Sequence, residues 1–279
     1  MLQFLRQLRL LDAADMLHYL WLVVRNWKKN RRFRKEHRDY PLPPPAIAFD
    51  AYGYVDWKLY HDSGIRHADV LADIINRFFG DRPLSILEWG CGPGRVIRHL
   101  QECLKQPCAL TGSDINRKSI KWCRANLPAI RFVENGVEPP LPFGAAAFDC
   151  IIARSVFTHL SEPMHYAWRD ELLRVLNPGG LILLTAHGDL FRNLHLNDEE
   201  KQAFDAGRLV IRGGILEGRK WYTAFHPPAF MKNSLLKDLK IIVHVPGPVA
   251  PMFEQDLWGV TPDLSGSGKV LMPARARNV

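Results

Sequence analysis

The stretch from Ser85 to Arg98 constrains the fold more than any other part of the chain. It begins with apolar residues typical of a buried strand, and Gly90, Gly92 and Gly94 follow at alternate positions. Alternating glycines let the backbone adopt conformations closed to other residues and let a ligand approach the main chain. A helix predicted from about Arg95 would point its free N–H groups toward that ligand. The pattern therefore predicts a strand, a glycine turn and a helix that bind a nucleotide-type ligand.

The spacing of these glycines argues against two common nucleotide sites. A dinucleotide site needs G-x-G-x-x-G, and Arg95 stands where the third glycine would be. A P-loop needs a Lys-Ser or Lys-Thr pair after its glycines, and this stretch has none. What remains, Glu-x-Gly-x-Gly-x-Gly after a strand, resembles the first motif of class I S-adenosylmethionine-dependent methyltransferases. The resemblance implies that the methionine part of that cofactor is held by Glu88, Gly90, Cys91, Gly92 and Gly94.

The next predicted strand ends in an acid. Residues 109–114 read as an apolar strand, and Asp114 lies 20 residues after Gly94. This is close to the offset at which a carboxylate accepts hydrogen bonds from ribose hydroxyls. Asp114 could equally cap the helix predicted from Asn116 to Ala125, and the two roles are compatible. By the resemblance, Asp114 binds the ribose of the cofactor and Ile115 lies beside it.

Two further predicted strands carry candidate residues just after their ends. In the methyltransferase family, the polar residue after the third strand, here 130–133, binds the adenine edge. Asn135 matches that place, with Gly136 next to it; many members have Asp there, whereas Asn offers both a donor and an acceptor. The fourth strand, 148–153, is continuously apolar, as expected of a parallel strand covered on both faces. Arg154 follows it directly and is assigned to the cofactor site.

His159 is the candidate catalytic base. The family places the methyl acceptor beyond the fourth strand, where this histidine stands. A neutral histidine can take a proton from an attacking hydroxyl or amine near pH 7. A lone histidine near a helix start is often only a cap or a core residue, so this alternative stays open. The usual Asn/Asp-Pro-Pro-Tyr/Phe motif of nucleobase or glutamine N-methylation is absent after this strand.

A further signature completes the resemblance. The helix predicted over Glu162–Leu176 ends at the Asn-Pro-Gly-Gly of residues 177–180, and Leu181–Thr185 reads as the fifth strand. Leu-x-Pro-Gly-Gly followed by an aliphatic strand is a recognisable methyltransferase signature. The resemblance thus spans about Leu84 to Thr185, with its motifs in the expected order. It implies an α/β class, a Rossmann-like sheet of seven mostly parallel strands with an antiparallel last strand, and S-adenosyl-L-methionine as the cofactor.

After this core, residues 188–227 are predicted to be an insertion on the substrate side, with a hairpin of 208–211 against 220–224. In the family such an insertion shapes the acceptor pocket, and a plain surface hairpin is the alternative. Lys240–Val245 and Gln255–Val260 read as the sixth and the antiparallel seventh strand. The candidate substrate residues in the insertion are Arg212, Tyr222 and His226.

The N-terminal part combines apolar residues at helical spacing with a basic run. Residues 25–38 contain eight of the cations of a chain whose net charge is +8. Three interpretations stay open: a helix lying on anionic lipid, a solvated helix packing on the domain or on a second subunit, and, least favoured without a recognition motif, nucleic-acid binding. The longest apolar run, 19–24, is too short to cross a bilayer, and no secretory signal fits.

These patterns divide the chain into three parts. Residues 1–45 form a basic, amphipathic helical extension with a Pro-rich linker, 46–261 the methyltransferase domain, and 262–279 a flexible tail. A helix is predicted over Tyr54–Phe79, and in it Tyr60 is a candidate for contacting the substrate or for packing between domains.

The predicted activity is methyl transfer to an oxygen or nitrogen atom of a small molecule or sugar, including a lipid-linked glycan. The alternatives are an RNA methyltransferase using the basic segment and a non-catalytic binding module of the same fold. Five cysteines without a C-x-x-C pair suggest reduced thiols, so we expect a cytoplasmic protein, in contact with a membrane only at its periphery if at all. No metal-ligand spacing is present, which predicts metal-independent chemistry.

Overall fold

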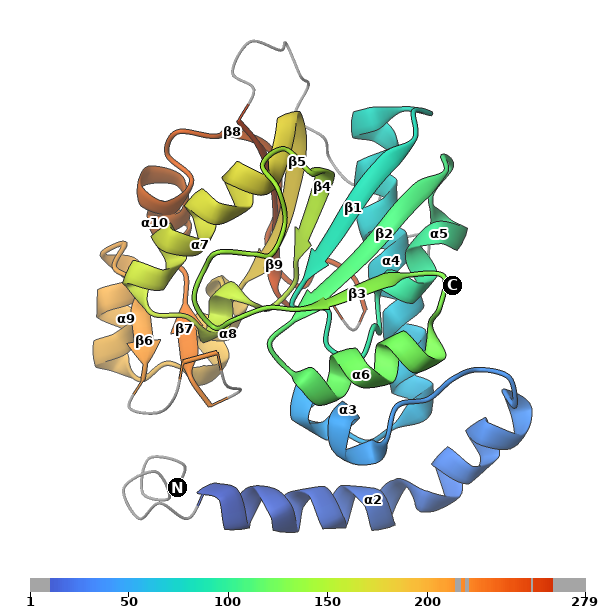
Figure 1. Cartoon of the computed structure of the whole chain (residues 1–279). Helices are drawn as coiled ribbons and strands as arrows, with labels where there is room; N and C mark the ends of the chain where they lie inside the picture. The colour runs from blue at the N-terminus through green and yellow to red at the C-terminus, as the bar shows by residue number, and fades with distance from the viewer. Residues whose placement is uncertain (1–10, 214–216, 219–220, 252, 263–279) are drawn as a thin grey trace. The chain divides into compact units, whose positions relative to one another are not determined.

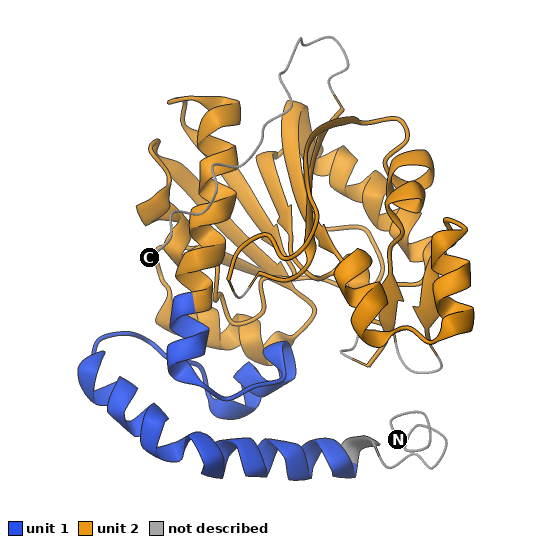
Figure 2. Cartoon of the chain, turned by 180° about the vertical axis from the view of Figure 1, so that it is seen from behind, with its two compact units in different colours: residues 1–62 blue, residues 63–279 orange. Residues whose placement is uncertain are grey.

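The computed structural model describes residues 11–213, 217–218, 221–251 and 253–262. The chain divides into two compact units, residues 1–62 and residues 63–279 (Figure 2). The boundary falls inside helix α4 (Trp57–Phe79). Within the described ranges, no helix combines the length and the apolar character needed to span a membrane.

Unit 1 is helical. It contains α2 (Leu11–Glu36), α3 (Pro45–Tyr52) and the beginning of α4. A proline at the first helical position favours the start of α3, and Gly53, with a φ of 73°, ends it. The segment 41–45, predicted to be only a linker, therefore also starts a helix. The core of the unit is small and largely aromatic, and includes Phe33, Phe49 and Trp57.

Unit 2 is built on a seven-stranded sheet (Figure 1). Its strand order is β3-β2-β1-β4-β5-β9-β8, and only β9 runs antiparallel to its neighbours. This confirms the predicted fold class. The strands are β1 (Leu84–Trp89), β2 (Cys108–Asp114), β3 (Arg131–Glu134), β4 (Phe148–Ala153), β5 (Leu176–Ala186), β8 (Lys240–Val245) and β9 (Asp256–Thr261).

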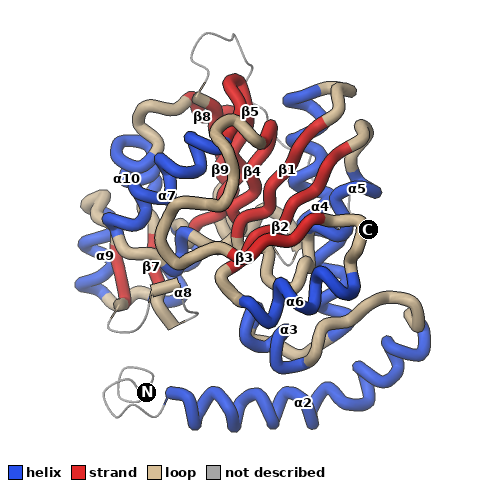
Figure 3. Tube along the Cα trace, viewed as in Figure 1, coloured by secondary structure: helices blue, strands red, loops and turns tan. Residues whose placement is uncertain are grey.

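Helices cover both faces of this sheet (Figure 3). Successive residues of a strand point to opposite faces, so Ile86 of β1 packs in one core and Leu87 in the other. The first core includes Leu71 of α4, and the second includes Trp168. Central strands that are buried on both faces explain why β1 and β4 read as continuous apolar runs. The covering helices include α5 (Ile97–Cys103), α6 (Arg117–Asn126), α7 (Glu162–Val175) and α10 (Pro228–Phe230), which continues into the π-helical turn η2 (Met231–Leu235).

Strand β5 begins earlier than predicted. It includes the Pro-Gly-Gly segment, and its register with β4 shifts there. Phe148 of β4 pairs with Leu176, whereas Cys150, two residues later, pairs with Leu181. Residues 177–180 bulge from the ladder there, and Gly179, with a φ of 72°, adopts the left-handed conformation. The glycines are therefore needed for an irregular strand rather than for a turn before it.

The insertion after β5 forms a small lobe of its own. The predicted hairpin is present as the antiparallel pair β6 (Val210–Arg212) and β7 (Thr223–Phe225), and helix α9 (Asp198–Asp205) comes before it. The preceding helix α8 (Asp189–His195) was not predicted. Phe204 and Phe225 lie in the lobe's own core. This lobe follows the carboxyl end of β5 and so belongs to the same edge of the sheet as the glycine turn.

Candidate functional site

The predicted cofactor residues lie at the carboxyl ends of β1 to β4. Parallel strands end at one edge of a sheet, and the strand order reverses between β1 and β4. Such a reversal leaves a crevice outside the strand ends, which is where α/β proteins bind their ligands. The short 3₁₀ helix η1 (Phe157–His159) follows β4 at this edge.

The turn after β1 requires its glycines. Gly90, Gly92 and Gly94 have φ angles of 74°, 52° and 69°, in the left-handed region that other residues avoid. A Cβ atom on Gly90 would also lie 2.3 Å from Cγ2 of Val156. The N–H groups of Gly90 and Cys91 both donate to the carbonyl of Ser113, at 2.8 and 3.0 Å. The turn is therefore fixed by its own backbone and packed tightly under the loop after β4.

Glu88 is buried at the end of β1. Its Oε2 accepts a hydrogen bond from the N–H of Ile97, at 2.9 Å, so this side chain satisfies the first helical residue of α5. Burial raises the pKa of Glu88 to about 7, and the positive charge of Arg154 acts in the opposite direction. Arg154 is thus placed where its charge acts on Glu88.

Arg95, which stands in place of a dinucleotide glycine, is also buried. Its Nη1 donates to Oγ of Ser63 at 2.6 Å, and its Nη2 lies 3.4 Å from Nδ1 of His67. The helix begins two residues later, at Ile97. This arginine therefore packs the turn against α4 rather than opening the helix.

Asp114 ties the glycine turn to β2. Its Oδ2 accepts from the N–H of Gly92 and its Oδ1 from the N–H of Asn116, both at 2.7 Å. The cap of α6 is Asn116, whose Oδ1 accepts from the N–H groups of Lys118 and Ser119. The capping role left open for Asp114 therefore belongs to Asn116.

Asn135 supplies an unsatisfied polar atom beside Asp114. Its N–H donates to the carbonyl of Asp114 at 3.2 Å, and its Nδ2 donates to the carbonyl of Gly136 at 2.7 Å. Its Oδ1 is buried and has no partner among the residues that the structure describes. A buried acceptor without a partner is costly, which points to a ligand that donates a hydrogen bond. The exocyclic amine of adenine fits this acceptor. Ile115 is half-buried, and a Cβ atom on Gly218 would lie 3.2 Å from its Cδ1.

His159 is held by the insertion lobe. Its Nδ1 lies 2.7 Å from the carbonyl of Tyr222. Because a carbonyl can only accept, Nδ1 carries the proton and Nε2 of the neutral ring keeps its lone pair. Burial lowers the pKa of His159, so the ring is neutral at pH 7. The tautomer and charge are those that a general base requires.

The loop between β4 and His159 has a strained backbone and is held by hydrogen bonds to distant residues. Ser155 has a φ of 63°, which is unusual for a residue other than glycine. Its N–H donates to Oγ1 of Thr185 at 2.8 Å, and its Oγ accepts from Nε2 of Gln255. Thr185 in turn donates to Oε1 of Gln255. The sequence had pointed to none of these three residues, because no local pattern signals a contact between positions 155 and 255.

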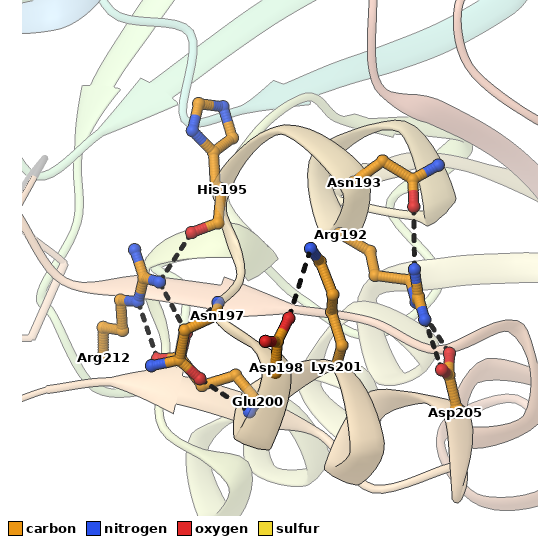
Figure 4. Close-up of polar contacts among 9 residues, drawn as sticks. All are labelled: Arg192, Asn193, His195, Asn197, Asp198, Glu200, Lys201, Asp205 and Arg212. Atoms are coloured by element: carbon orange, nitrogen blue, oxygen red, sulfur yellow. Dashed lines mark hydrogen bonds and ion pairs between the residues drawn. The ribbon is translucent and has the colours of Figure 1, made fainter.

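Two of the candidate substrate residues have structural partners instead. Arg212 forms an ion pair with Glu200 and donates to the carbonyl of His195, at 2.6 and 2.7 Å, joining β6 to α8 and α9 (Figure 4). Nε2 of His226 lies 2.8 Å from Nε2 of His165, and both rings are buried. Burial lowers the pKa of each, to about 4 for His165. The His226 ring is therefore buried against α7.

The other two occupy different places. Tyr222 is 9% exposed, and its carbonyl orients His159, so its backbone contributes to the site. Tyr60 belongs to unit 1, where its buried ring packs 5.8 Å from that of Tyr52 and 6.1 Å from that of Trp57. It has a packing role within that unit. The described residues contain no group of three or more histidine, cysteine or acidic side chains placed to hold a metal ion.

Comparison with known proteins finds similarity to methyltransferases. A family model described as a methyltransferase domain matches residues 86–180. The chain is 32% identical over 165 residues to phthiotriol/phenolphthiotriol dimycocerosates methyltransferase 1 of Mycobacterium ulcerans, covering 52% of this chain and 57% of that protein. It is 30% identical over 152 residues to trans-aconitate 2-methyltransferase of an Azoarcus species, covering 54% and 58%. The chain therefore spans a little over half the length of these relatives.

The fold is shared with solved structures. The PH0226 protein of Pyrococcus horikoshii superposes with a TM-score of 0.53 over 82% of this chain and 99% of that chain, at 16% sequence identity. At this identity the likeness concerns the fold. The matched family segment contains the ends of β1 to β4, where the glycine turn, Asp114 and Asn135 meet.

Proposed function

Because the chain is a class I S-adenosylmethionine-dependent methyltransferase, we propose that it transfers the methyl group of this cofactor to an oxygen or nitrogen atom of a small-molecule or sugar acceptor. The observation that carries the assignment of the site is the buried, unpartnered Oδ1 of Asn135, next to Asp114 and the glycine turn. A nucleoside with a donor on its base and hydroxyls on its sugar satisfies both residues at once.

Each predicted cofactor-binding residue contacts a different part of S-adenosylmethionine in this proposal. Asn135 accepts from the adenine amine, and the carboxylate of Asp114, at the end of β2 beside the glycine turn, accepts from the ribose hydroxyls. The backbone of Gly90 to Gly94 lets the methionine part approach closely, and Glu88 offers a carboxylate to its ammonium group. When bound, the cofactor supplies a methyl group already activated by a sulfonium. The protein therefore has to orient two reactants more than it has to activate them.

The acceptor side is built around His159. A hydroxyl acceptor must lose a proton as it attacks, and Nε2 of neutral His159 can take it. An amine acceptor attacks through its own lone pair and can do without this base. The bonds of Ser155 to Thr185 and Gln255 fix the loop between Arg154 and His159, which keeps both at constant positions relative to the glycine turn. A base fixed in this way loses little entropy when the acceptor binds.

The named relatives support a small acceptor. Their names specify phthiotriol dimycocerosates and trans-aconitate as the substrates of those proteins, and neither is a nucleic acid or a protein. The sugar, the lipid-linked glycan and the choice between oxygen and nitrogen are parts of our proposal that rest on the sequence.

The experiment is a label-transfer screen. Full-length protein is incubated with S-adenosylmethionine carrying a tritiated methyl group and with pools of hydroxylated acids, sugars and lipid extracts. We expect label in the small-molecule fraction, and none with boiled protein. Label found in added RNA or in protein instead would contradict the proposal, and a failure to bind S-adenosylhomocysteine in calorimetry would overturn the cofactor site itself.

Once an acceptor is found, His159→Gln tests the base. With a hydroxyl acceptor, kcat should fall by roughly a hundredfold or more, while affinity for S-adenosylhomocysteine stays unchanged. An unchanged kcat with a hydroxyl acceptor would remove His159 from the mechanism.

A further inference from the structure

One helix of unit 1 carries most of the large apolar side chains that are exposed in the described part of the chain. Six of the eight lie in residues 16–27 of α2, and the other two are Val137 and Leu194. Val24 is 76% exposed and Leu17 is 69% exposed. Single exposed apolar residues are ordinary, but a contiguous set on one element marks a surface for a partner.

These side chains form a single stripe along α2. Leu17, Leu20, Val24 and Trp27 are separated by three or four residues, so they share one side of the helix. The same spacing continues to Arg31 and onward into the basic run. The stripe is therefore apolar in its first half and cationic in its second half. We call it the α2 stripe.

The opposite side of α2 already has a packing role. Tyr19, Leu22 and Phe33 pack with Phe49 of α3 in the core of unit 1. Asn30 lies between the two sides of the helix, and its Nδ2 donates to the carbonyl of Val55 at 3.0 Å. The α2 stripe is thus not the surface that folds this unit.

A pocket of about 420 Å³ opens at the cationic half of the stripe, entirely within unit 1. Trp27 and Trp57 line it, and the guanidinium of Arg34 lies 5.7 Å from the centre of the Trp57 ring. Its cations are Arg31, Arg34, Lys35 and Arg38. None of these four forms an ion pair with a carboxylate of the described residues, whereas Lys29 and Arg32 do. Unpaired guanidinium groups in a concave site favour a phosphate.

We propose that the α2 stripe and its cationic pocket bind the anionic face of a lipid bilayer. The apolar half would enter the boundary between headgroups and acyl chains, with Trp21 and Trp27 at the interface, and the pocket would receive lipid phosphates. This binding surface goes beyond the methyl-transfer site and does not depend on it.

The charge pattern disfavours the two other occupants. Two parallel copies of the stripe would place the cationic halves against each other, and two antiparallel copies would place cations against apolar side chains. RNA would be attracted by the pocket, but it would leave Leu17, Leu20 and Val24 exposed to water. Only an amphiphilic anionic surface matches both halves.

The test is flotation of the full-length protein with vesicles of phosphatidylcholine alone and of phosphatidylcholine mixed with phosphatidylglycerol. We expect binding to the mixed vesicles that weakens as salt is added. Each cation near an anionic leaflet contributes about a factor of five, so R31Q/R34Q/K35Q should lower the partition coefficient about a hundredfold. The matched control, K105Q/K121Q/K237Q, removes the same charge from exposed positions of unit 2 and should bind as the unaltered protein does.

A second matched pair tests the apolar half. Leu17→Gln should weaken binding about tenfold, whereas Leu194→Gln, at a residue that is 63% exposed in the insertion lobe, should have no effect. Equal binding of the unaltered protein to both kinds of vesicle would overturn the proposal. So would an equal loss of vesicle binding in a variant of α2 and in its matched control. A dimer that light scattering detects and that Leu17→Gln breaks would also overturn it. The same holds if the unaltered protein binds RNA tightly but no vesicles, and R31Q/R34Q/K35Q abolishes the RNA binding.

Discussion

Asn135 allows a quantitative test of the cofactor site. In the free protein, Asn135→Ala removes the bond from Nδ2 to the carbonyl of Gly136, which costs about 1 kcal/mol. It also removes the buried, unpartnered Oδ1, which relieves a penalty of about 1–3 kcal/mol. The two effects oppose each other. We therefore expect the free energy of unfolding of the free protein to stay the same or to rise by up to about 2 kcal/mol.

Ligand binding should respond differently, because the ligand satisfies Oδ1. S-inosylhomocysteine carries a carbonyl in place of the adenine amine, so it would bring one acceptor against another. The unaltered protein should prefer S-adenosylhomocysteine by about 2–3 kcal/mol, and Asn135→Ala should reduce this preference below about 1 kcal/mol. Calorimetry with both ligands and both proteins gives the coupling energy of the double-mutant cycle.

The control is Asn126→Ala. This residue makes a similar bond, from its Nδ2 to the carbonyl of Trp122 at 2.8 Å, at the end of α6. Its replacement should leave the ligand preference unchanged. If Asn135→Ala retained the full preference for the adenine amine, another group would have to bind that amine, and our assignment of Asn135 would be refuted.

Three further predictions concern stability. Burial lowers the pKa of His187 to about 3, so the unfolded chain takes up a proton that the folded chain refuses, and the free energy of unfolding should fall as the pH drops from about 6.5 toward 3. Urea denaturation at pH 5 should show a loss of about 2 kcal/mol from this residue, which His187→Asn abolishes. Gly90→Ala, at a φ of 74° and with a neighbouring side chain 2.3 Å from the new Cβ, should cost about 3 kcal/mol or more. Gly80→Ala, at a φ of 65° in open space, should cost only about 1 kcal/mol in thermal denaturation. Gln255→Ala should cost about 2–3 kcal/mol, because it removes the hydrogen bonds to the buried Thr185 and the half-buried Ser155, whereas the exposed Gln202→Ala should stay within about 0.5 kcal/mol. Equal losses of stability in the two variants would show that these hydrogen bonds do not stabilise the loop after β4.

The buried candidate residues show that residue type alone does not identify a substrate-binding residue. His226 and Tyr60 have chemistry suited to a substrate site, yet the first is paired with His165 and the second packs in the core of unit 1. Residue type and place in the chain could not separate these roles, because burial depends on neighbours from distant segments. Tyr222 shows the reverse case, since its backbone carbonyl rather than its side chain serves the site.

The sequence by itself determined the features that depend on neighbouring residues. The apolar run of β1, the glycine turn and the acid at the end of β2 follow from local patterns and their spacing. The seven-stranded fold was implied by the resemblance of these motifs to a known family. The tertiary structure alone decided which polar atoms are satisfied. Asp114 accepts from the N–H of Gly92 across 22 positions, Tyr222 fixes the tautomer of His159 across 63, and Gln255 reaches Ser155 across 100. These contacts join segments that are far apart in the chain, and hydrogen bonding between such segments is set by packing rather than by any repeat that a sequence displays.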